Sequence, residues 1–502
     1  MEHSRLAELA KEDPERKFFS IAHLLTPQAL YQAFLSLRKD ASAGVDRVTY
    51  ADYGKQAHQN IEELHDRLKS KTYRVQPLRR IYIPKEDGKA QRPISIPSLE
   101  DKIVQKAVVD LLTPIYEQDF LDCSYGFRPG RGAQEALDEI GRALCREPIS
   151  CVLELDIQSY FDSIVREQLM EMIEGRISDA SILRLIRKFI NVGVIDDGRL
   201  LLSETGTGQG QIISPLLANV YLHFVLDQWI EREVKPRLRG KVFLIRYADD
   251  AVLCFQYRED AEKVMNVLPK RFARYGLTLH PEKTRLVAFG RQALAEASRT
   301  GAKPDTFDFL GFTHKCARSR RGKFTVHVNT MKKRLRRSLK GITEWCRTHR
   351  HYDVGWQQAT LNAKLRGHYQ SMGGPRTSAA CGSSIGRFSG PGRNGSAAGR
   401  GEGPSHGRST RRSCTAIRYC NPGSRALGPR RRVIPEEPTG VIPQGGLCEG
   451  GGSTSATVNL NGHAAGNGGH RQGTPKRVCS ILSYSAKDPR SRHAAVVARS
   501  CR

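Results

Sequence analysis

The chain has 502 residues, and its 80 Lys and Arg against 52 Asp and Glu give a formal net charge of +28. This surplus favours a polyanionic partner, most often nucleic acid, although proteins that bind membrane surfaces can also be basic. No apolar run is long enough to cross a bilayer, the charged N-terminus lacks the apolar core of a secretory signal, and the 12 cysteines include no Cys-x-x-Cys pair. We therefore expect a cytoplasmic protein with reduced cysteines, no zinc ribbon and no membrane contact.

The first elements are predicted to be helices followed by a hairpin. A helix over 26–39 has Thr26 as its N-cap. The stretch "LRRIYIPKEDGKAQRPISIP" (78–97) is typical of two short strands around a Glu-Asp-Gly-Lys turn. A helix from about 99 to 112 follows, and we expect it to stop before Pro114 because proline disrupts a helix interior.

The middle of the chain alternates strands and helices. "CVLELDI" (151–157) is predicted to be a buried strand, and "KVFLIRYADDAVLCF" (241–255) two strands around a tight turn. Between them, Ser214 is the expected N-cap of a largely buried helix with Pro215 at its first position. A further helix is expected near 259–274. Strands separated by helices, with hairpins between, indicate an α/β or α+β sheet domain.

The composition changes abruptly after about Met372. Residues 376–502 contain 22 Gly and 18 Arg but only two Lys, with no sustained period of 2 or 3.6. Such a segment buries too little apolar surface to offset its ordering entropy, so we predict that it is mostly disordered. We hypothesise that the reading frame shifts near Ser371; the alternative is a genuine Arg/Gly-rich tail that binds RNA.

Three carboxylates stand at the ends of two apolar strands. Asp156 ends "CVLEL", and Asp249 and Asp250 lie within "FLIRYADDAVL". An ionised carboxylate costs several kcal/mol to bury unless its charge is compensated, and hard divalent cations prefer oxygen ligands. Two Mg²⁺ ions about 4 Å apart would compensate the charge and could activate a 3′-hydroxyl for in-line displacement. The alternative for the Asp-Asp dipeptide alone is a solvated turn.

Seven motifs in the same order resemble those of bacterial group II intron reverse transcriptases, and this resemblance covers roughly residues 20–372. The Tyr247-Ala248-Asp249-Asp250 stretch is similar to the family's signature box. The other blocks are "IYIPKEDGKAQRPISIPSLEDKIVQ", "SYGFRPGRGAQEAL", "LELDIQSYFDSI", "GTGQGQIISPLLANVYLH", "GLTLHPEKTRLV" and "FDFLGF".

The resemblance implies a right-hand polymerase fold. Fingers and an antiparallel palm would occupy residues 61–315, after a helical extension at 1–60. A partial thumb with the maturase-specific segment would cover 316–372, and the Gly/Arg-rich segment 373–502 would follow. The family's thumb helices normally continue beyond the equivalent of Gln370, so this chain departs from the pattern there.

The resemblance also implies roles for individual residues. Asp156, Asp249 and Asp250 would be the catalytic acids and metal ligands, with the carbonyl of Ile157 as a further ligand. Asp162 would be a structural carboxylate rather than a ligand.

The incoming nucleotide would be bound by a second group of residues. Arg forks onto two phosphate oxygens and Lys acts as a point charge, which suits triphosphate binding by Arg92 and Lys85 on the hairpin. Phe161 would lie under the sugar and exclude a 2′-hydroxyl, and Gln209 would contact the nucleotide. Lys283 is a further candidate. The alternative for Lys85 and Arg92 is a solvated hairpin face. For Gln209 it is an ordinary Gly-rich loop, and for Lys283 a surface lysine.

Basic residues crowd the predicted helix "NTMKKRLRRSLKGITEW" (329–345), which suits contact with a template–primer backbone. These residues are Lys332, Lys333, Arg334, Arg336 and Arg337. A solvated helix face is the alternative. The following "WQQATLNAKLRGHYQ" (356–370) resembles the maturase-specific thumb segment, whose partner would be group II intron RNA.

The implied function is RNA-directed DNA polymerisation with an associated role in intron RNA splicing. The cofactors would be two Mg²⁺ ions, with Mn²⁺ as a substitute. The partners would be intron RNA, an RNA template with a DNA primer, and deoxynucleoside triphosphates; nothing is implied about the oligomeric state. The alternatives are a non-catalytic RNA-binding splicing factor and an inactive truncated remnant.

Overall fold

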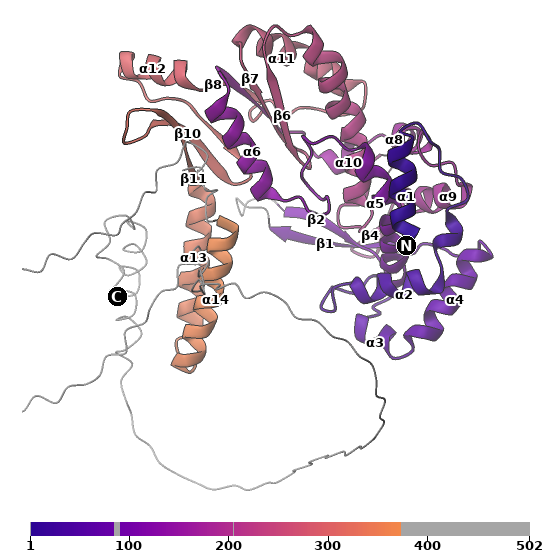
Figure 1. The fold of residues 1–502 in the computed structure, drawn as a ribbon. Helices are drawn as coiled ribbons and strands as arrows, with labels where there is room; N and C mark the ends of the chain where they lie inside the picture. The colour runs from indigo at the N-terminus through magenta and orange to yellow at the C-terminus, as the bar shows by residue number, and fades with distance from the viewer. Residues whose placement is uncertain (1, 85–90, 204, 373–502) are drawn as a thin grey trace, which may run out of the picture. The chain divides into compact units, whose positions relative to one another are not determined.

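The computed structural model describes residues 2–84, 91–203 and 205–372 (Figure 1). The predictions for Lys85 and for segment 373–502 lie outside these residues. The described α-helices are α1 (Glu2–Glu12), α2 (Pro27–Ser36), α3 (Tyr50–Gly54), α4 (Ala57–Lys69), α5 (Leu99–Asp119), α6 (Ala133–Arg146), α7 (Tyr160–Ser163), α8 (Arg166–Glu174), α9 (Ala180–Ile190), α10 (Ser214–Leu222), α11 (Arg258–Ala273), α12 (Arg291–Thr300), α13 (Lys332–Thr348) and α14 (Val354–Met372). Within the described ranges, no helix is both long enough and apolar enough to span a membrane.

The described strands form three sheets. The strands are β1 (Leu78–Pro84), β2 (Gln91–Ile96), β3 (Cys151–Leu155), β4 (Val194–Asp196), β5 (Arg199–Leu201), β6 (Val242–Tyr247), β7 (Asp250–Phe255), β8 (Arg285–Ala288), β9 (Thr306–Phe309), β10 (Phe312–Arg318) and β11 (Phe324–Thr330). The sheet orders are β2-β1-β4-β5, β6-β7-β3-β8 and β11-β10-β9. This mixture of helices and largely antiparallel sheets agrees with the expected fold class.

Helix α2 begins as its sequence predicts. The Thr26 hydroxyl accepts a hydrogen bond from the Ala29 N–H at 3.1 Å, and Pro27 occupies the first helical position. The helix ends at Ser36 rather than at the predicted residue 39. Its buried face, which includes Leu30 and Phe34, packs against α5.

Helix α5 does not stop before Pro114, so that prediction was wrong. The helix runs through Pro114 and ends at Asp119. An interior proline costs about 3 kcal/mol because it removes one backbone hydrogen bond and crowds the preceding turn. Beyond it, Ile115 and Tyr116 are buried in the core. Burial of side chains of this size contributes roughly 1.5–3 kcal/mol each, which offsets the cost.

The predicted cap of α10 is displaced by one residue. Ser214 lies in the first helical turn, and its hydroxyl donates to the Gly208 carbonyl at 3.0 Å instead of accepting from the helix. Ile213 is the residue before the helix. The helix continues into a π-helical turn, His223–Asp227, which the sequence did not indicate.

The strand pairing of the hairpin predicted at 78–97 is confirmed, whereas its Glu-Asp-Gly-Lys turn lies outside the described residues. Strands β1 and β2 are antiparallel, with Ile83 opposite Arg92. Strand β1 also pairs in parallel with β4, which continues into a short hairpin with β5. This second hairpin was not predicted, because strands of three residues leave almost no periodicity to detect.

The central sheet, β6-β7-β3-β8, is antiparallel throughout and is covered on both faces. Leu153 and Leu253 belong to one hydrophobic cluster, whereas their neighbours Val152 and Val252 belong to another. Helix α11 packs on the first face, and helix α6 on the other (Figure 1). Successive side chains of a strand point to opposite faces, so this double burial explains why β3 is apolar on both faces apart from Glu154.

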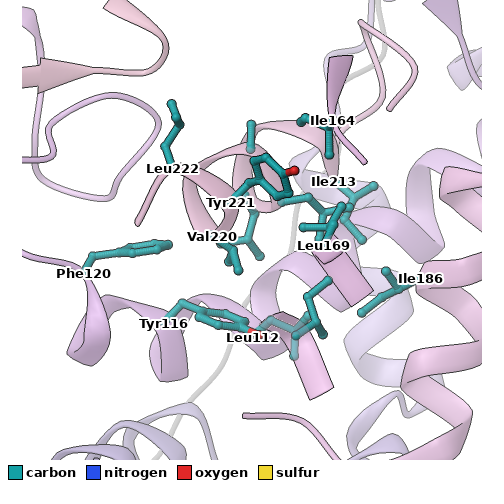
Figure 2. Close-up of a cluster of buried hydrophobic side chains, with 14 of the residues drawn as sticks. Leu112, Tyr116, Phe120, Ile164, Leu169, Ile186, Ile213, Val220, Tyr221 and Leu222 are labelled. Atoms are coloured by element: carbon teal, nitrogen blue, oxygen red, sulfur yellow. The ribbon is translucent and has the colours of Figure 1, made fainter. Parts of the chain in front are cut away.

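The larger hydrophobic cluster joins the helices beside this sheet. In Figure 2, side chains from α5, α8, α9 and α10 gather around one centre. Tyr160 supports them with a hydrogen bond from its hydroxyl to the Ala218 carbonyl at 2.6 Å. The Tyr221 hydroxyl likewise donates to the Tyr275 carbonyl at 2.8 Å. These two hydroxyls therefore have partners, whereas the buried Tyr116 hydroxyl of the same cluster has none among the described residues.

Glu154 connects the central sheet to the sheet β11-β10-β9. Its carboxylate accepts a hydrogen bond from the Asp308 N–H at 2.6 Å and is ion-paired with Arg285 of β8. Arg285 also donates to the Thr306 carbonyl at 3.1 Å. Helix α13 follows β11 and is joined to the β9–β10 turn, because Arg334 donates to the Leu310 carbonyl at 3.0 Å.

Candidate active site

The strand register brings the three predicted catalytic acids to one end of the central sheet. Leu155 pairs with Ala251, so the next residue, Asp156, continues the antiparallel register opposite Asp250. Directly opposed residues place their side chains on the same face of a sheet. Asp249 lies in the turn between β6 and β7, where Tyr247 pairs with Asp250.

The turn that carries Asp249 contains two residues and is strained. Ala248 has φ = +56°, a left-handed conformation that is uncommon for residues other than glycine. Gly126 lies directly against it: a Cβ added to Gly126 would come 2.4 Å from the Ala248 nitrogen. Only glycine permits so close an approach. Strain held in this way is characteristic of functional sites.

Arg246 holds this turn in place through hydrogen bonds. Its guanidinium is fully buried and donates all five of its hydrogen bonds. The acceptors are both carboxylate oxygens of Asp227, at 2.8 and 2.6 Å, and the Asn219 carbonyl oxygen, the Ala248 carbonyl and the Ser124 hydroxyl, at 3.0, 2.9 and 2.7 Å. The group therefore links Asp227, Asn219 and Ser124 to Ala248, the residue before Asp249.

The sequence reading did not identify Arg246 or Asp227 as functional residues. The available signal was a charged residue inside the apolar stretch "FLIRY", since a buried arginine requires a partner. Asp227 could not have been chosen as that partner, because it lies in the π-helical turn and only the folded chain brings it to Arg246.

The clustered carboxylates repel one another. Burial first, and then the charges of Asp249 and Asp156, raise the pKa of Asp250 to about 7. The Asp250 side chain reaches solvent, yet protein surrounds it on enough sides for desolvation to dominate. Burial also raises the pKa of Asp249, as does the charge of Asp156, whereas Arg92 and Arg246 act in the opposite direction. The site therefore favours a bound cation.

In the structure, Lys283 compensates part of this negative charge by pairing with Asp156. Its ammonium group lies 3.1 Å from Oδ2 and 3.3 Å from Oδ1 of Asp156. More than half of the lysine side chain is exposed, so the pair is held loosely. The Asp156 carbonyl is held more firmly, accepting from the His280 N–H at 2.8 Å. Lys283 was predicted to contact nucleotide, and in the structure it pairs with Asp156, one of the predicted catalytic acids.

The donor set suits a divalent cation that a substrate helps to bind. Within the described ranges, no group of three or more His, Cys, Asp or Glu side chains is arranged to hold a metal ion by itself. Mg²⁺ is usually bound by one or two carboxylates together with waters and substrate phosphates rather than by an all-protein cage. Carboxylates whose pKa is raised by burial and also by mutual repulsion fit such a site, because a cation would compensate their charge.

The residues predicted to bind nucleotide lie on segments that are bonded together. The Phe161 carbonyl accepts from the Thr207 N–H at 2.8 Å, and the Gln209 carbonyl accepts from the Ser95 N–H at 2.7 Å. The loop 205–211 therefore joins α7 to β2, the strand that carries Arg92. Gly210 has φ = +113°, and a Cβ there would come 2.6 Å from the Ser95 carbonyl oxygen.

The basic residues of α13 lie on a helix without any buried residue. Lys332, Lys333, Arg336 and Arg337 are exposed, as a surface that contacts nucleic acid requires. Arg334 is half-buried and turns towards the Leu310 carbonyl.

The central part of the chain is similar to known proteins. Residues 83–314 match the family model described as "Reverse transcriptase (RNA-dependent DNA polymerase)". Protein YkfC of Escherichia coli is 38% identical over 243 residues, which are 47% of this chain and 63% of that protein. The group II intron-encoded protein LtrA of Lactococcus lactis is 35% identical over 227 residues, 45% of this chain and 37% of LtrA.

A third relative is an uncharacterized 91 kDa protein in the cob intron of Schizosaccharomyces pombe. It is 40% identical over 173 residues, 34% of this chain and 21% of that protein. The matches therefore span less than two thirds of each of these relatives. Proteins with this type of domain generally use divalent metal ions and nucleic acid substrates.

Proposed function

We propose that this chain is an RNA-directed DNA polymerase, because residues 83–314 match a reverse transcriptase family model and the chain is similar to the group II intron-encoded protein LtrA. It adds deoxynucleotides to a DNA 3′ end on an RNA template and releases pyrophosphate. One observation supports this most directly: the register of β3 against β7 aligns Asp156 with Asp250, next to the turn that holds Asp249.

Two Mg²⁺ ions are the proposed cofactors. Asp156, Asp249 and Asp250 would hold them, with the Ile157 carbonyl as a further ligand. Bound divalent ions activate a hydroxyl nucleophile and stabilise charge on the leaving group. The chain itself positions the carboxylates, because Arg246 holds the turn that presents Asp249.

Other residues would bind the incoming nucleotide. Arg92, whose charge already acts on Asp249, would take the triphosphate together with Lys85. Phe161 would pack under the sugar and exclude a ribose 2′-hydroxyl. Gln209 would contact the nucleotide from the loop bonded to β2.

Nucleic acid would also contact the chain beyond the central sheet. The exposed basic residues of α13 would track the backbone of the template–primer. The α14 segment would bind intron RNA and support splicing. In this proposal, residues 61–315 are the fingers and palm, and 316–372 are the partial thumb with the maturase-specific segment.

Primer extension by the full chain tests the proposal. An RNA template annealed to a DNA primer is incubated with deoxynucleoside triphosphates and Mg²⁺. The wild type should extend the primer, and Asp249→Ala/Asp250→Ala should abolish extension while leaving RNA binding within about threefold, since phosphate contacts dominate affinity. The matched control is Glu62→Ala/Glu63→Ala, an adjacent exposed acidic pair on α4. A wild type that binds intron RNA but extends no primer would replace the polymerase with the splicing-factor function.

A further inference from the structure

A large aromatic side chain is exposed to solvent beside the turn that carries Asp249. Phe127 is 54% exposed and has φ = +58°, a left-handed conformation that is rarely adopted by a bulky residue. A strained and exposed aromatic residue is unfavourable for the chain alone, in both its backbone energy and its contact with water. Its neighbours explain how this conformation persists.

The residues before Phe127 are bonded to the catalytic hairpin. The Tyr125 N–H donates to the Arg246 carbonyl at 2.9 Å, and the Arg246 N–H donates to the Cys123 carbonyl at 2.8 Å. The Gly126 carbonyl accepts from the Asn219 side chain at 2.7 Å. Asn219 is also a partner of Arg246, so this segment and the Asp249 turn share one network.

The residue after Phe127 is anchored as firmly. The Arg128 guanidinium is buried and bonds both carboxylate oxygens of Glu117, with distances of 3.0 to 3.1 Å. It also donates to the Leu121 and Ser124 carbonyls at 2.8 and 2.9 Å. Because both flanks are fixed, Phe127 cannot fold back into the core.

Phe127 lies next to Tyr247, the first residue of the Tyr-Ala-Asp-Asp stretch. Their ring centroids are 6.4 Å apart, with the ring planes inclined at 41°. Tyr247 ends β6, and its successor Ala248 begins the turn that holds Asp249. The two rings therefore form an aromatic surface within two residues of a catalytic acid.

The order of the strands indicates which substrate would contact this aromatic surface. Strand β7 is central, with β6 on one side and β3 on the other. The proposed nucleotide-binding residue Phe161 follows β3, whereas Phe127 adjoins β6. The aromatic surface and the nucleotide side thus flank Asp249 and Asp250 from opposite sides. The substrate that must approach from the side opposite the incoming nucleotide is the primer 3′ end.

We propose that Phe127 and Tyr247 form the contact surface for the 3′-terminal nucleotide of the primer, with Phe127 as the main contributor. This proposal rests on the proposed function for the identity of the primer. Every nucleotide presents a base face and sugar C–H groups, so an aromatic side chain stacks on it without sequence preference. The contact would place the terminal hydroxyl beside the catalytic acids and cover a ring that is otherwise exposed.

The test measures binding separately from chemistry. Fluorescence anisotropy gives the Kd of the full chain for an RNA template annealed to a DNA primer, without nucleotides. Phe127→Ala keeps the Cβ and hence the backbone strain, so it removes only the ring. We expect this variant to raise that Kd about tenfold, a typical effect of losing one stacked base. The Kd for the single-stranded RNA template should change less than about twofold, since phosphate contacts are unaltered.

Companion variants identify the ring as the cause. Phe127→Trp should keep wild-type affinity, and Phe127→Leu should be intermediate, because leucine is apolar but has no planar face to stack. The matched control is Phe19→Ala, which removes an even more exposed phenylalanine from the N-terminal region and should change neither Kd. A primer ending in 2-aminopurine gives a local signal: wild type should change its fluorescence on binding, and Phe127→Ala should lose most of that change.

Two results would overturn the inference. One is wild-type affinity of Phe127→Ala for the template–primer; the other is equal weakening for template–primer and single strand. Failure of the proposed function looks different. In that case the wild type extends no primer, while the difference between wild type and Phe127→Ala in binding the primer end remains.

Discussion

Arg246 and Asp227 form an ion pair at 2.6 Å in which both side chains are completely buried. Removing one partner of such a pair typically costs about 3–5 kcal/mol, whereas replacing both by apolar residues is often close to neutral. Single and double variants of this pair can therefore separate its effect on the stability of the fold from its effect on the position of the Asp249 turn.

We predict that Asp227→Leu alone lowers the free energy of unfolding by about 3–5 kcal/mol, because Arg246 stays buried without its main partner. Arg246→Met/Asp227→Leu should recover most of that loss in urea unfolding. It should not recover primer extension, because the Ala248 carbonyl still lacks the donor that fixes it. Recovery of both properties in the double variant would show that the arginine acts only on stability.

Gly126→Ala should impair the catalytic turn without a general loss of fold. The new methyl group would meet the Ala248 nitrogen at 2.4 Å, so the turn must shift. A displacement of about 1 Å at a reacting centre can reduce the rate about 100-fold, and we expect a loss of that order in primer extension. Gly130→Ala is the control for a nearby glycine: Gly130 has a positive φ, unlike Gly126, and no atom lies within 4 Å of its added Cβ. An equal or larger loss in the Gly130 variant would show that the close approach to Ala248 is not the cause.

Lys283→Met should strengthen Mg²⁺ binding. The lysine lies 3.1 Å from an oxygen of Asp156 and competes with any cation for that carboxylate. Exposed pairs contribute up to about 1 kcal/mol, so the apparent Kd for Mg²⁺ should fall by no more than about fivefold. Calorimetric titration measures this. Lys241→Met, which removes a similarly exposed lysine paired with Glu147, serves as the control. If Lys283→Met instead raises the Km for nucleotide and leaves the affinity for Mg²⁺ unchanged, Lys283 binds the nucleotide as the sequence predicts.

The raised pKa of Asp250 predicts a pH-dependent response to Mg²⁺. In the folded chain the pKa is about 7, above the ordinary value of 3.8, so the metal-free fold loses stability as the pH rises from about 4 to about 7. A bound cation removes this penalty. Mg²⁺ should therefore raise the Tm more at pH 8 than at pH 5.5, and Asp250→Asn should flatten the difference. An equal shift in Tm at both pH values would contradict the assignment.

The sequence was sufficient for strands β3, β6 and β7 and for the position of the predicted acids at their ends. Asp156, Asp249 and Asp250 lie at the ends of apolar runs, and these runs form the paired strands of the central sheet. Confirmation of the β1–β2 hairpin has the same basis, since alternating strands around a polar turn leave a local pattern.

Features that depend on tertiary contacts could not be predicted. The course of α5 through Pro114 depends on burial of Ile115 and Tyr116, which outweighs a local helix-breaking signal. The partner of Arg246 could not be identified from the sequence, because Asp227 lies in a separate segment and only folding brings the two together. The conformation of Phe127 likewise has no local cause, since the contacts of its neighbours hold it.

The network around Arg246 also bears on when the protein becomes competent during synthesis. Segment 123–125 leaves the ribosome long before Arg246, yet the two must pair to define the turn at Asp249. Contacts between such distant parts of a chain form slowly, because loop closure must precede any gain from the contact. The proposed catalytic centre therefore cannot form before residue 246 has been synthesised, and nascent chains that end before this residue cannot contain it.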